Sequence, residues 1–382
     1  MQNFIKLFNI GNKITFLRKK IIVSVISDLL TDQRVIKECK TLLSLNYEVV
    51  LIGRHSENDF GLKDRGYMVV RFKNIFRRGP AMYLCFNIQL FFYLLFQRVD
   101  VLWANDLDCL LPNYLISNLK SVKLIYDSHE YFTMSVIKLS SRKIWNKLEA
   151  YIFPRLKNVI TVNNSIKKVY EDKYHVPITV IRNVPYLSKE AINFDIDPNK
   201  KILIIQGVGI NENRGAEEAV EMMRFLPERF LLYFIGRGTV IPYLKKRVKE
   251  LHLEKQIIFI DPLPYEEMMA YTRKSFLGLI LEKIDVTDEH MFALPNRFFD
   301  YIKACIPILS TAAIEVKNLI EKYQIGMIAE YLSPEYLAEC VLNIEKNIDQ
   351  YRQYKNNTVV AASDLCWEKE EEVLKEFVGK IK

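Results

Sequence analysis

The amino-acid sequence predicts an α/β protein with two Rossmann-like domains, each built around its own parallel sheet. Short apolar runs alternate with amphipathic stretches of helix length along the chain. Continuous apolar strands are typical of parallel sheets that helices cover on both faces. The polar stretch YLSKEAINFDIDPNK (186–200) interrupts this alternation, which then starts afresh. A chain of 382 residues is long enough for two cores of this kind.

The first half of the chain is expected to supply seven strands and the helices between them. The strands are IIVSVIS (21–27), EVVLIG (48–53), YMVVRF (67–72), VDVLWAN (99–105), VKLIYDSHE (122–130), NVITVN (158–163) and ITVIRN (178–183). Amphipathic spacing places helices at about 32–45, within 80–97, and near 108–119, 141–155 and 164–173.

The second half repeats the alternation with six strands. These are KILIIQG (201–207), FLLYFIG (230–236), IIFI (257–260), FLGLIL (276–281), IPILST (306–311) and GMIA (326–329). Helices are expected near 215–225, 240–252, 264–273 and 315–322, in a short segment that Pro295 opens, and at about 333–347 and 366–379. We therefore predict a first domain over 1–185, a linker over 186–200, a second domain over 201–365, and a C-terminal helix over 366–382 that packs back toward the first domain.

Composition and charge narrow the function classes. The six cysteines are scattered without a CxxC pair, which favours reduced thiols in a cytoplasmic protein and argues against a structural zinc site. Residues 1–185 hold 28 Lys and Arg against 15 Asp and Glu, a net charge of +13, and the remainder carries −5. A basic half suggests an anionic partner. No nucleic-acid-binding motif is present, so a membrane surface is the better candidate, and a solvated basic face is the alternative.

Residues 81–97 (AMYLCFNIQLFFYLLFQ) contain no charged side chain. They are short for a membrane span, and we expect a partly buried crossover helix, with a face lying in the membrane interface as the second possibility. In that second case Phe91, Phe92 and Leu95 turn inward or toward acyl chains, and Lys73, Arg77 and Arg78 lie near lipid phosphates.

Polar residues at the carboxyl ends of the predicted strands are the site candidates, because open parallel sheets bind ligands there. The first strand is not followed by a GxGxxG, so a dinucleotide site is not expected. NDLD (105–108) offers Asp106 and Asp108, and DSHE (127–130) offers His129 and Glu130. Imidazole can donate to a sugar hydroxyl or exchange a proton near neutral pH; the alternative is a structural histidine in a loop network.

In the second half, QGVGINENRG (206–215) follows a strand and opens a helix. Gly207 and Gly209 let the backbone approach a ligand, and Arg214 lies near the helix start, where a diphosphate would be attracted. A second glycine turn, IGRG (235–238), adds Arg237. The turn IDPLPYEEM (260–268), with Asp261 and Leu263, could flank a base, but a turn followed by a helix start is the default interpretation.

In their order along the chain these segments resemble the GT-B glycosyltransferases of the retaining family-4 type, over nearly the whole sequence. The likeness rests on YDSHEYF (126–132), VIRNVP (180–185), NRGAEEAVEMM (213–223), LLYFIGRG (231–238), IIFIDPLPYEEM (257–268) and ALPNRFFDYIKACIPIL (293–309). The resemblance implies two Rossmann-like domains facing across a cleft, with the second binding a nucleotide-diphosphate sugar and the first binding the acceptor.

The same resemblance implies roles for individual residues. Arg214 would hold the donor diphosphate, Asp300 the ribose hydroxyls, and His129 the transferred sugar, so His129 and Arg214 are the catalytic candidates. The donor site would comprise Gly207, Gly209, Arg214, Arg237, Asp261, Leu263, Glu289, Leu294, Pro295, Asn296, Arg297 and Asp300. The acceptor side would comprise Asp106, Asp108 and Glu130. No metal or other cofactor is expected, because arginine and helix dipoles can neutralise the leaving group.

The chain departs from the family pattern at two positions. Phe292 stands where the first glutamate of the usual pair falls, and Glu289 or His290 could substitute for it. Val208 stands at the first cation, and Arg237 or Arg297 could replace it. The expected function is transfer of a sugar, with retention, to a glycan or lipid-linked acceptor in surface polysaccharide or glycolipid synthesis, in the cytoplasm or peripherally on the inner face of the membrane. The alternatives are a nucleotide-sugar epimerase of the same fold and a non-catalytic nucleotide-binding partner of a transferase.

Overall fold

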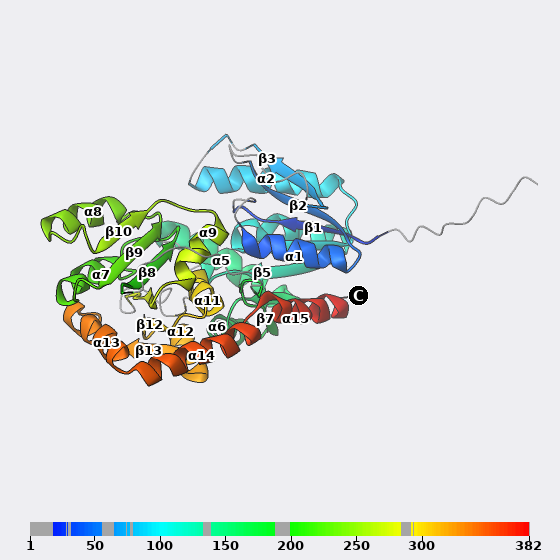
Figure 1. Ribbon diagram of the computed structural model, residues 1–382. Helices are drawn as coiled ribbons and strands as arrows, with labels where there is room; N and C mark the ends of the chain where they lie inside the picture. The colour runs from blue at the N-terminus through cyan, green and yellow to red at the C-terminus, as the bar shows by residue number, and fades with distance from the viewer. Residues whose placement is uncertain are drawn as a thin grey trace, which may run out of the picture. The chain divides into compact units, whose positions relative to one another are not determined.

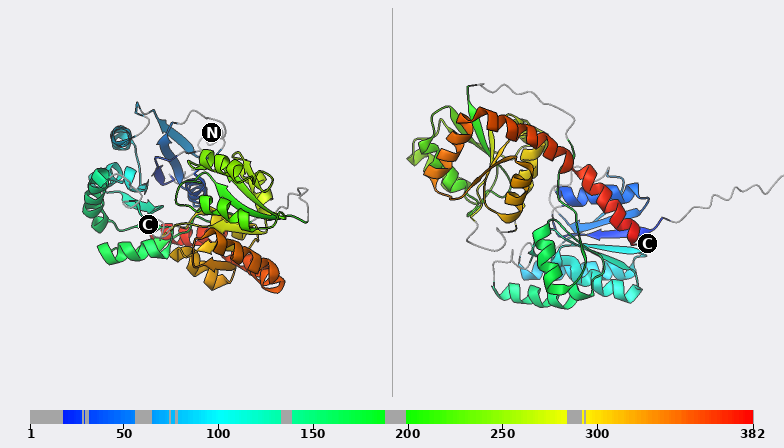
Figure 2. Two further views of the ribbon diagram at one scale, coloured as in Figure 1. Left: turned by 90° about the vertical axis from the view of Figure 1, so that its left-hand side faces the viewer. Right: turned by 90° about the horizontal axis from the view of Figure 1, so that it is seen from below.

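The computed structural model describes residues 18–27, 29, 32–55, 65–73, 75–76, 79–132, 139–187, 199–283, 292 and 294–381. Within these ranges it contains two parallel sheets with helices packed against them (Figures 1 and 2). The chain divides into two compact units, and the boundary between Ile125 and Tyr126 falls inside a strand of the first sheet. The domain boundaries expected from the sequence stay a prediction.

The first sheet has seven strands in the order β3-β2-β1-β4-β5-β6-β7. They are β1 (Lys20–Ser24), β2 (Glu48–Arg54), β3 (Met68–Phe72), β4 (Val101–Asn105), β5 (Lys123–Ser128), β6 (Val159–Thr161) and β7 (Ile178–Val180). In β1, Ile22 pairs with Val50 on one side and Leu102 on the other, both in parallel register. All seven expected strands are confirmed, but β6 and β7 have only three residues each.

The helices of this half begin where the sequence provides caps. Asp32 accepts a hydrogen bond from the backbone of Val35 at the start of α1, and Asn163 does the same for Ile166 at the start of α6. The helices are α1 (Gln33–Ser44), α2 (Pro80–Phe96), α3 (Leu110–Lys120), α5 (Leu139–Ile152) and α6 (Asn164–Tyr174), with short 3₁₀ turns at Leu107–Cys109 and Phe153–Arg155.

The second sheet has six parallel strands in the order β10-β9-β8-β11-β12-β13. They are β8 (Lys201–Gly207), β9 (Phe230–Gly236), β10 (Ile257–Ile260), β11 (Leu277–Ile280), β12 (Ile308–Thr311) and β13 (Gly326–Ala329). The helices are α7 (Ala216–Met222), α8 (Ile241–Glu250), α9 (Tyr265–Arg273), α11 (Asn296–Lys303), α12 (Ile314–Tyr323), α13 (Pro334–Lys346), α14 (Ile348–Asp364) and α15 (Trp367–Lys380), with a 3₁₀ turn at Met223–Phe225.

Helices cover both faces of this second sheet. Helix α7 packs against α8 and α13 in one layer, and α11 packs against α9 and α14 in the other. Helix α14 was not expected from the sequence, because its segment is polar and it buries only small side chains, Thr358, Ala361 and Ala362. Helix α15 contacts the segment that follows β7: Glu370 accepts hydrogen bonds from the backbone and side chain of Arg182.

One close contact seats α11 against the sheet. Tyr301 is fully buried, and its hydroxyl donates to the backbone oxygen of Ile204 in β8 at 3.0 Å. Its ring lies against Gly278 of β11, where an added Cβ would come within 2.3 Å of the ring. Because α11 can approach the sheet this closely only at a glycine, Gly278 sets the position of the helix that carries Arg297 and Asp300.

Helix α2 separates the side chains that the sequence analysis grouped together. Phe91 and Leu95 are half-buried, whereas Leu84, Ile88, Phe92 and Phe96 are 48–79% exposed, one helical turn apart. The buried stripe, Met82, Phe86, Leu90 and Leu94, faces the core. No described helix has both the length and the apolarity needed to cross a membrane. Arg77 and Arg78 lie outside the described residues.

Candidate active site

The site is built at the carboxyl edge of the second sheet, where β8 and β11 lie side by side. From β8 the chain proceeds to β9 on one side, and β11 and β12 continue the sheet on the other. At such a switch point the loops leaving neighbouring strands turn to opposite faces of the sheet, which opens a crevice for ligands. The loop after β8, the segment after β11 and the start of α11 all belong to this edge.

The loop after β8 packs directly on the glycine turn after β9. Gly236 has a φ of +133°, and a Cβ there would lie 1.9 Å from the backbone oxygen of Gly207, so no other residue fits without displacement. The backbone of Arg237 donates to Gly207 at 3.1 Å and accepts from Ile210 at 3.2 Å. The two predicted glycine turns therefore adjoin, and the side chain of Arg237 is exposed beside them.

The far end of the same loop is fastened to the end of β11. The backbone N–H of Lys283 donates to Asn213 at 2.9 Å. Gly215 has a φ of +72°, and a Cβ there would lie 2.1 Å from the backbone oxygen of Leu281. These contacts bring Arg214, which lies between Asn213 and Gly215, next to the residue that follows Leu281.

That residue is Glu282, which the sequence analysis did not identify. Its side chain is fully buried, and its Oε1 accepts from Arg297 Nη2 at 2.7 Å and pairs with Arg214 Nη1 at 3.5 Å. The predicted donor-site residues Arg214 and Arg297 thus meet on one carboxylate. The signal was available, because Glu282 follows an apolar strand of a parallel sheet as the other candidates do.

Helix α11 begins at Asn296, and Pro295 occupies the N-cap position rather than the first helical position that the sequence suggested. Among the described residues no side chain caps this terminus. The backbone oxygen of Pro295 accepts from Phe298 at 2.9 Å. The N–H groups at a helix start attract anions.

Asp300 is held by two neighbours. Its Oδ1 accepts from the Tyr265 hydroxyl at 2.8 Å and its Oδ2 from Gln206 Nε2 at 3.3 Å. Gln206 is itself oriented by the Thr272 hydroxyl at 2.6 Å. Partial burial and the nearby Asp300 carboxylate raise the pKa of Tyr265, so its hydroxyl stays protonated and able to donate. A carboxylate fixed in this way can still accept from the hydroxyls of a ligand.

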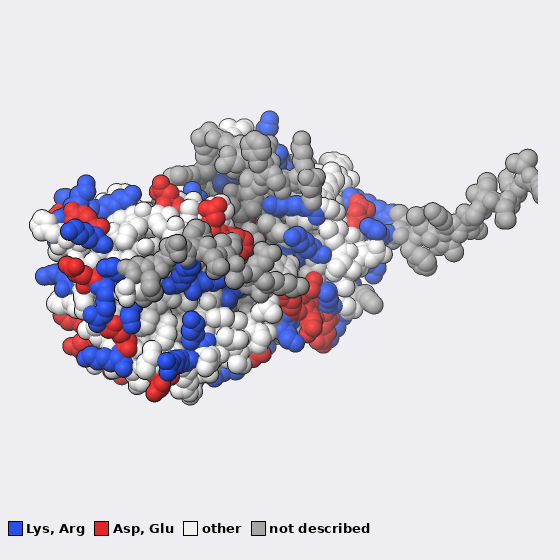
Figure 3. Space-filling view, viewed as in Figure 1, with Lys and Arg blue, Asp and Glu red and all other residues white. Residues whose placement is uncertain are grey.

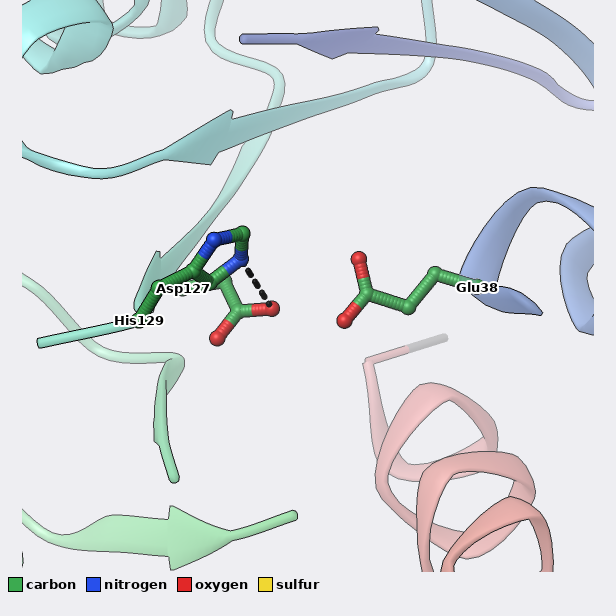
Figure 4. A group of neighbouring side chains, drawn as sticks. All are labelled: Glu38, Asp127 and His129. Carbon is green, nitrogen blue, oxygen red and sulfur yellow. Dashed lines mark ion pairs between the residues drawn. The ribbon is translucent and has the colours of Figure 1, made fainter. Parts of the chain in front are cut away.

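His129 lies just beyond β5, in the turn that the sequence singled out. Its Nε2 is 3.5 Å from Oδ2 of Asp127, whose side chain is fully buried (Figure 4). A buried carboxylate beside an imidazole fixes the orientation of the ring. The neighbouring Glu130 is exposed, and its backbone oxygen accepts from the Ser128 hydroxyl at 2.8 Å.

The remaining candidates lie in turns and loops of the two halves. Asp106 has a φ of +61° and precedes the 3₁₀ turn that contains Asp108. In the turn before α9, Asp261 is exposed and Leu263 is half-buried. Gly209 faces open space, and Leu294 is half-buried. Glu289 and His290 lie outside the described residues. Charges of both signs are mixed over the second-sheet half in the view of Figure 3.

Comparison with known proteins gives one family match to part of the chain and several structural matches to nearly all of it. Residues 33–184 match the model of Glycosyltransferase Family 4. A sucrose-phosphate synthase from Thermosynechococcus elongatus is 12% identical with a TM-score of 0.76, and a glycosyltransferase from Rickettsia africae is 15% identical with 0.74; each match covers 95% of this chain and 99% of the other. HepE of Anabaena in complex with UDP-glucose is 13% identical with a TM-score of 0.73, over 94% of this chain and 99% of the other. No curated protein sequence matches.

The likeness to the solved structures extends over both sheets, and the family model covers most of the first. The expected fold class is confirmed. The chain has the GT-B fold, and its residues 33–184 match the model of Glycosyltransferase Family 4.

Proposed function

We propose that this protein is a glycosyltransferase that takes its sugar from a nucleotide-diphosphate sugar and transfers it, with retention, to a glycan or lipid-linked acceptor in surface polysaccharide or glycolipid synthesis. The observation that carries the donor assignment is the pair of arginines, Arg214 and Arg297, gathered at the carboxyl edge of the second sheet. Guanidinium groups bind phosphates with charge-assisted hydrogen bonds. The structural relative HepE binds UDP-glucose, which makes a uridine nucleotide the first donor to test.

Each part of the site has a role in this reaction. Arg214 and the N–H groups at the start of α11 stabilise the negative charge that grows on the departing diphosphate. Asp300, oriented by Tyr265 and Gln206, accepts from the ribose hydroxyls. His129, fixed by Asp127, donates to a hydroxyl of the transferred sugar. We also propose that the reaction requires no metal ion.

The test begins with a thermal-shift screen of UDP, GDP, ADP and their sugar conjugates. Donor turnover with and without glycan acceptors follows, and NMR reads the anomeric configuration of the product. We expect one donor class to stabilise the protein and the His129→Ala variant to bind it while losing transfer. Interconversion of free nucleotide-sugars would favour the epimerase alternative. Binding without turnover under any acceptor would favour the non-catalytic partner, which the Phe292 position also suggests.

We further propose that the protein approaches its acceptor at an anionic membrane. Helices α2 and α3 pack together, and both carry exposed leucine, isoleucine and phenylalanine side chains at one-turn intervals. The exposed side chains are Leu84, Ile88, Phe92 and Phe96 on α2 and Leu111, Leu115 and Leu119 on α3. Lys120 ties the two helices by donating to the backbone oxygens of Leu94 and Gln97. Larger apolar patches of this kind mark interaction surfaces.

Charge selects a lipid surface as the partner. Residues 1–185 carry a net +13, and the exposed Arg98 and Lys123 lie just beyond α2 and α3. Each basic residue close to an anionic bilayer contributes about 1 kcal/mol. We expect the full chain to sediment with vesicles containing phosphatidylglycerol at low salt and less at high salt. Phe92→Ser with Leu119→Ser should weaken binding, whereas Val359→Ser with Val360→Ser on α14, equally exposed apolar positions, should not. Equal binding by both double variants would contradict the assignment.

A further inference from the structure

Glu282 and its two arginines form an asymmetric cluster. Arg297 is only 7% exposed and donates to Glu282 Oε1 at 2.7 Å, whereas Arg214 is 28% exposed and lies 3.5 Å from the same oxygen. The first contact is a short charge-assisted hydrogen bond, and the second is a looser ion pair. The buried arginine is therefore the firmly held one, and the more accessible arginine is the loosely held one.

The cluster is also incomplete in charge and in hydrogen bonds. Two guanidinium groups and one carboxylate leave a net charge of +1. Among the described residues, Glu282 Oε2 and Arg297 Nε, both buried, have no hydrogen-bond partner. An excess buried positive charge is costly, so an anion placed against the two guanidinium groups would lower the free energy of the cluster. A diphosphate supplies such charge and several acceptor oxygens.

The backbone around Glu282 is held on both sides. Its carbonyl oxygen accepts from the Thr311 hydroxyl at 2.7 Å, at the end of β12. The N–H of the following residue, Lys283, donates to Asn213 in the loop that carries Arg214. Glu282 is thus fixed relative to the neighbouring strand and to that loop, which is what a residue needs if it is to orient a third group.

We propose that Glu282 is a positioning residue of the donor site: held by Arg297, it grips one edge of the Arg214 guanidinium and presents the rest to the diphosphate. Guanidinium carries five N–H donors, so a contact through Nη1 leaves donors for phosphate oxygens. Arg297 acts through Glu282. The exposed Arg237 is then the residue that replaces the family's first cation, whose position is occupied by Val208 in this chain. This inference rests on the proposed use of a nucleotide-diphosphate donor.

The test compares Glu282→Gln with a matched control. Glu345→Gln is suitable because Glu345 also holds two cations, Arg229 and Lys201, but at the amino ends of β8 and β9. With UDP and UMP as probes in calorimetric titrations, we expect Glu282→Gln to weaken UDP binding about tenfold and UMP binding less, since one charge-assisted contact is loosened. Glu345→Gln should leave both affinities unchanged. In an Arg214→Ala background Glu282→Gln should cause no further loss, a coupling that a merely structural role would not produce.

The outcomes separate this inference from the proposed function. If the wild-type protein binds none of UDP, GDP and ADP, the donor assignment itself is overturned. If it binds UDP and Glu282→Gln binds it equally well, or loses a further tenfold in the Arg214→Ala background, only the positioning role is overturned. Should Glu282→Gln fail to fold, Glu282→Asp keeps the charge but shortens the side chain, so contact with Arg214 is lost and UDP should bind several-fold more weakly. Unchanged affinity in that variant would also refute the role.

Discussion

Two glutamates that flank the second sheet each hold two cations, and they lie at opposite edges of that sheet. Glu345 on α13 binds Arg229 through both carboxylate oxygens, at 2.8 and 2.7 Å, and Lys201 at 3.1 Å. Glu282 uses one oxygen for both of its arginines. Glu345 is 12% exposed, and hydrogen bonding from Arg229 lowers its pKa. Glu282 is fully buried.

The difference shows that a glutamate holding two cations can either stabilise packing or leave charge available for a ligand. At the amino edge a bidentate, partly exposed pair is complete and fastens α13 to the starts of β8 and β9. At the carboxyl edge the cluster retains one excess positive charge and unpaired polar atoms, next to glycine loops and an uncapped helix start. A complete pair contributes to packing, whereas an incomplete one can gain from a ligand. Four predictions test this contrast, from the largest expected effect to the smallest.

The largest effect is expected from Gly215→Ala. The added Cβ would lie 2.1 Å from the backbone oxygen of Leu281 at a positive φ, so the loop must separate from β11. We expect a loss of at least about 1–3 kcal/mol in the free energy of unfolding, measured by urea denaturation, together with weaker UDP binding. Gly209→Ala, in the same loop but facing open space, should change stability by no more than about 0.5 kcal/mol. Similar stability of the two variants would show that the loop is not fastened there.

Arg214→Ala should weaken nucleotide-diphosphate binding by roughly 1.5–3 kcal/mol, because a charge-assisted contact with the diphosphate is lost. The matched control is Arg229→Ala, which removes an arginine from the amino-edge pair and should leave the affinity unchanged. Isothermal titration with UDP measures both variants. Wild-type affinity in Arg214→Ala would remove Arg214 from the donor site.

Asp300→Asn should lower UDP affinity by roughly 1 kcal/mol without unfolding the chain. The carboxylate can accept from two ribose hydroxyls, whereas the amide presents a single acceptor oxygen. Melting curves and titrations with UDP are measured on the same samples. If the variant loses its fold, Asp300 is a structural residue that serves Tyr265 and Gln206, and the ribose assignment fails at this position.

The smallest effect distinguishes the two glutamates by salt. Exposed ion pairs are screened at high ionic strength and buried ones much less. The drop in melting temperature caused by Glu345→Gln should shrink between 0.05 and about 1 M sodium chloride, whereas the drop caused by Glu282→Gln should persist. Equal salt dependence would mean that the two clusters do not differ in burial in solution.

Local patterns were enough to predict the sheets. The apolar strands of β8 and β9 end in glycine turns, and Asn163 and Asp32 cap their helices as their residue types suggest. The polar helix α14 was missed, because a helix that buries small side chains shows no strong apolar period. It packs against α11, α12 and α13.

The outward face of α2 could not be predicted for a related reason. All its faces are apolar, so periodicity could not tell the buried stripe from the exposed one. Packing against the sheet and against α3 decides which side of the helix is buried. Phe86 and Leu90 are buried, and Ile88 and Phe92 are exposed.

The sequence by itself determined the fold class and the places of the candidate residues Arg214, Asp300 and His129 at strand ends and helix starts. These follow from short-range regularities: strand ends, glycine turns and helix starts. Only the tertiary structure decided the partners, joining Arg214 to Arg297 through Glu282 and Asp300 to Tyr265 of another helix. Contacts between residues far apart in sequence depend on crossover and packing geometry, which residue spacing along one strand or helix does not encode.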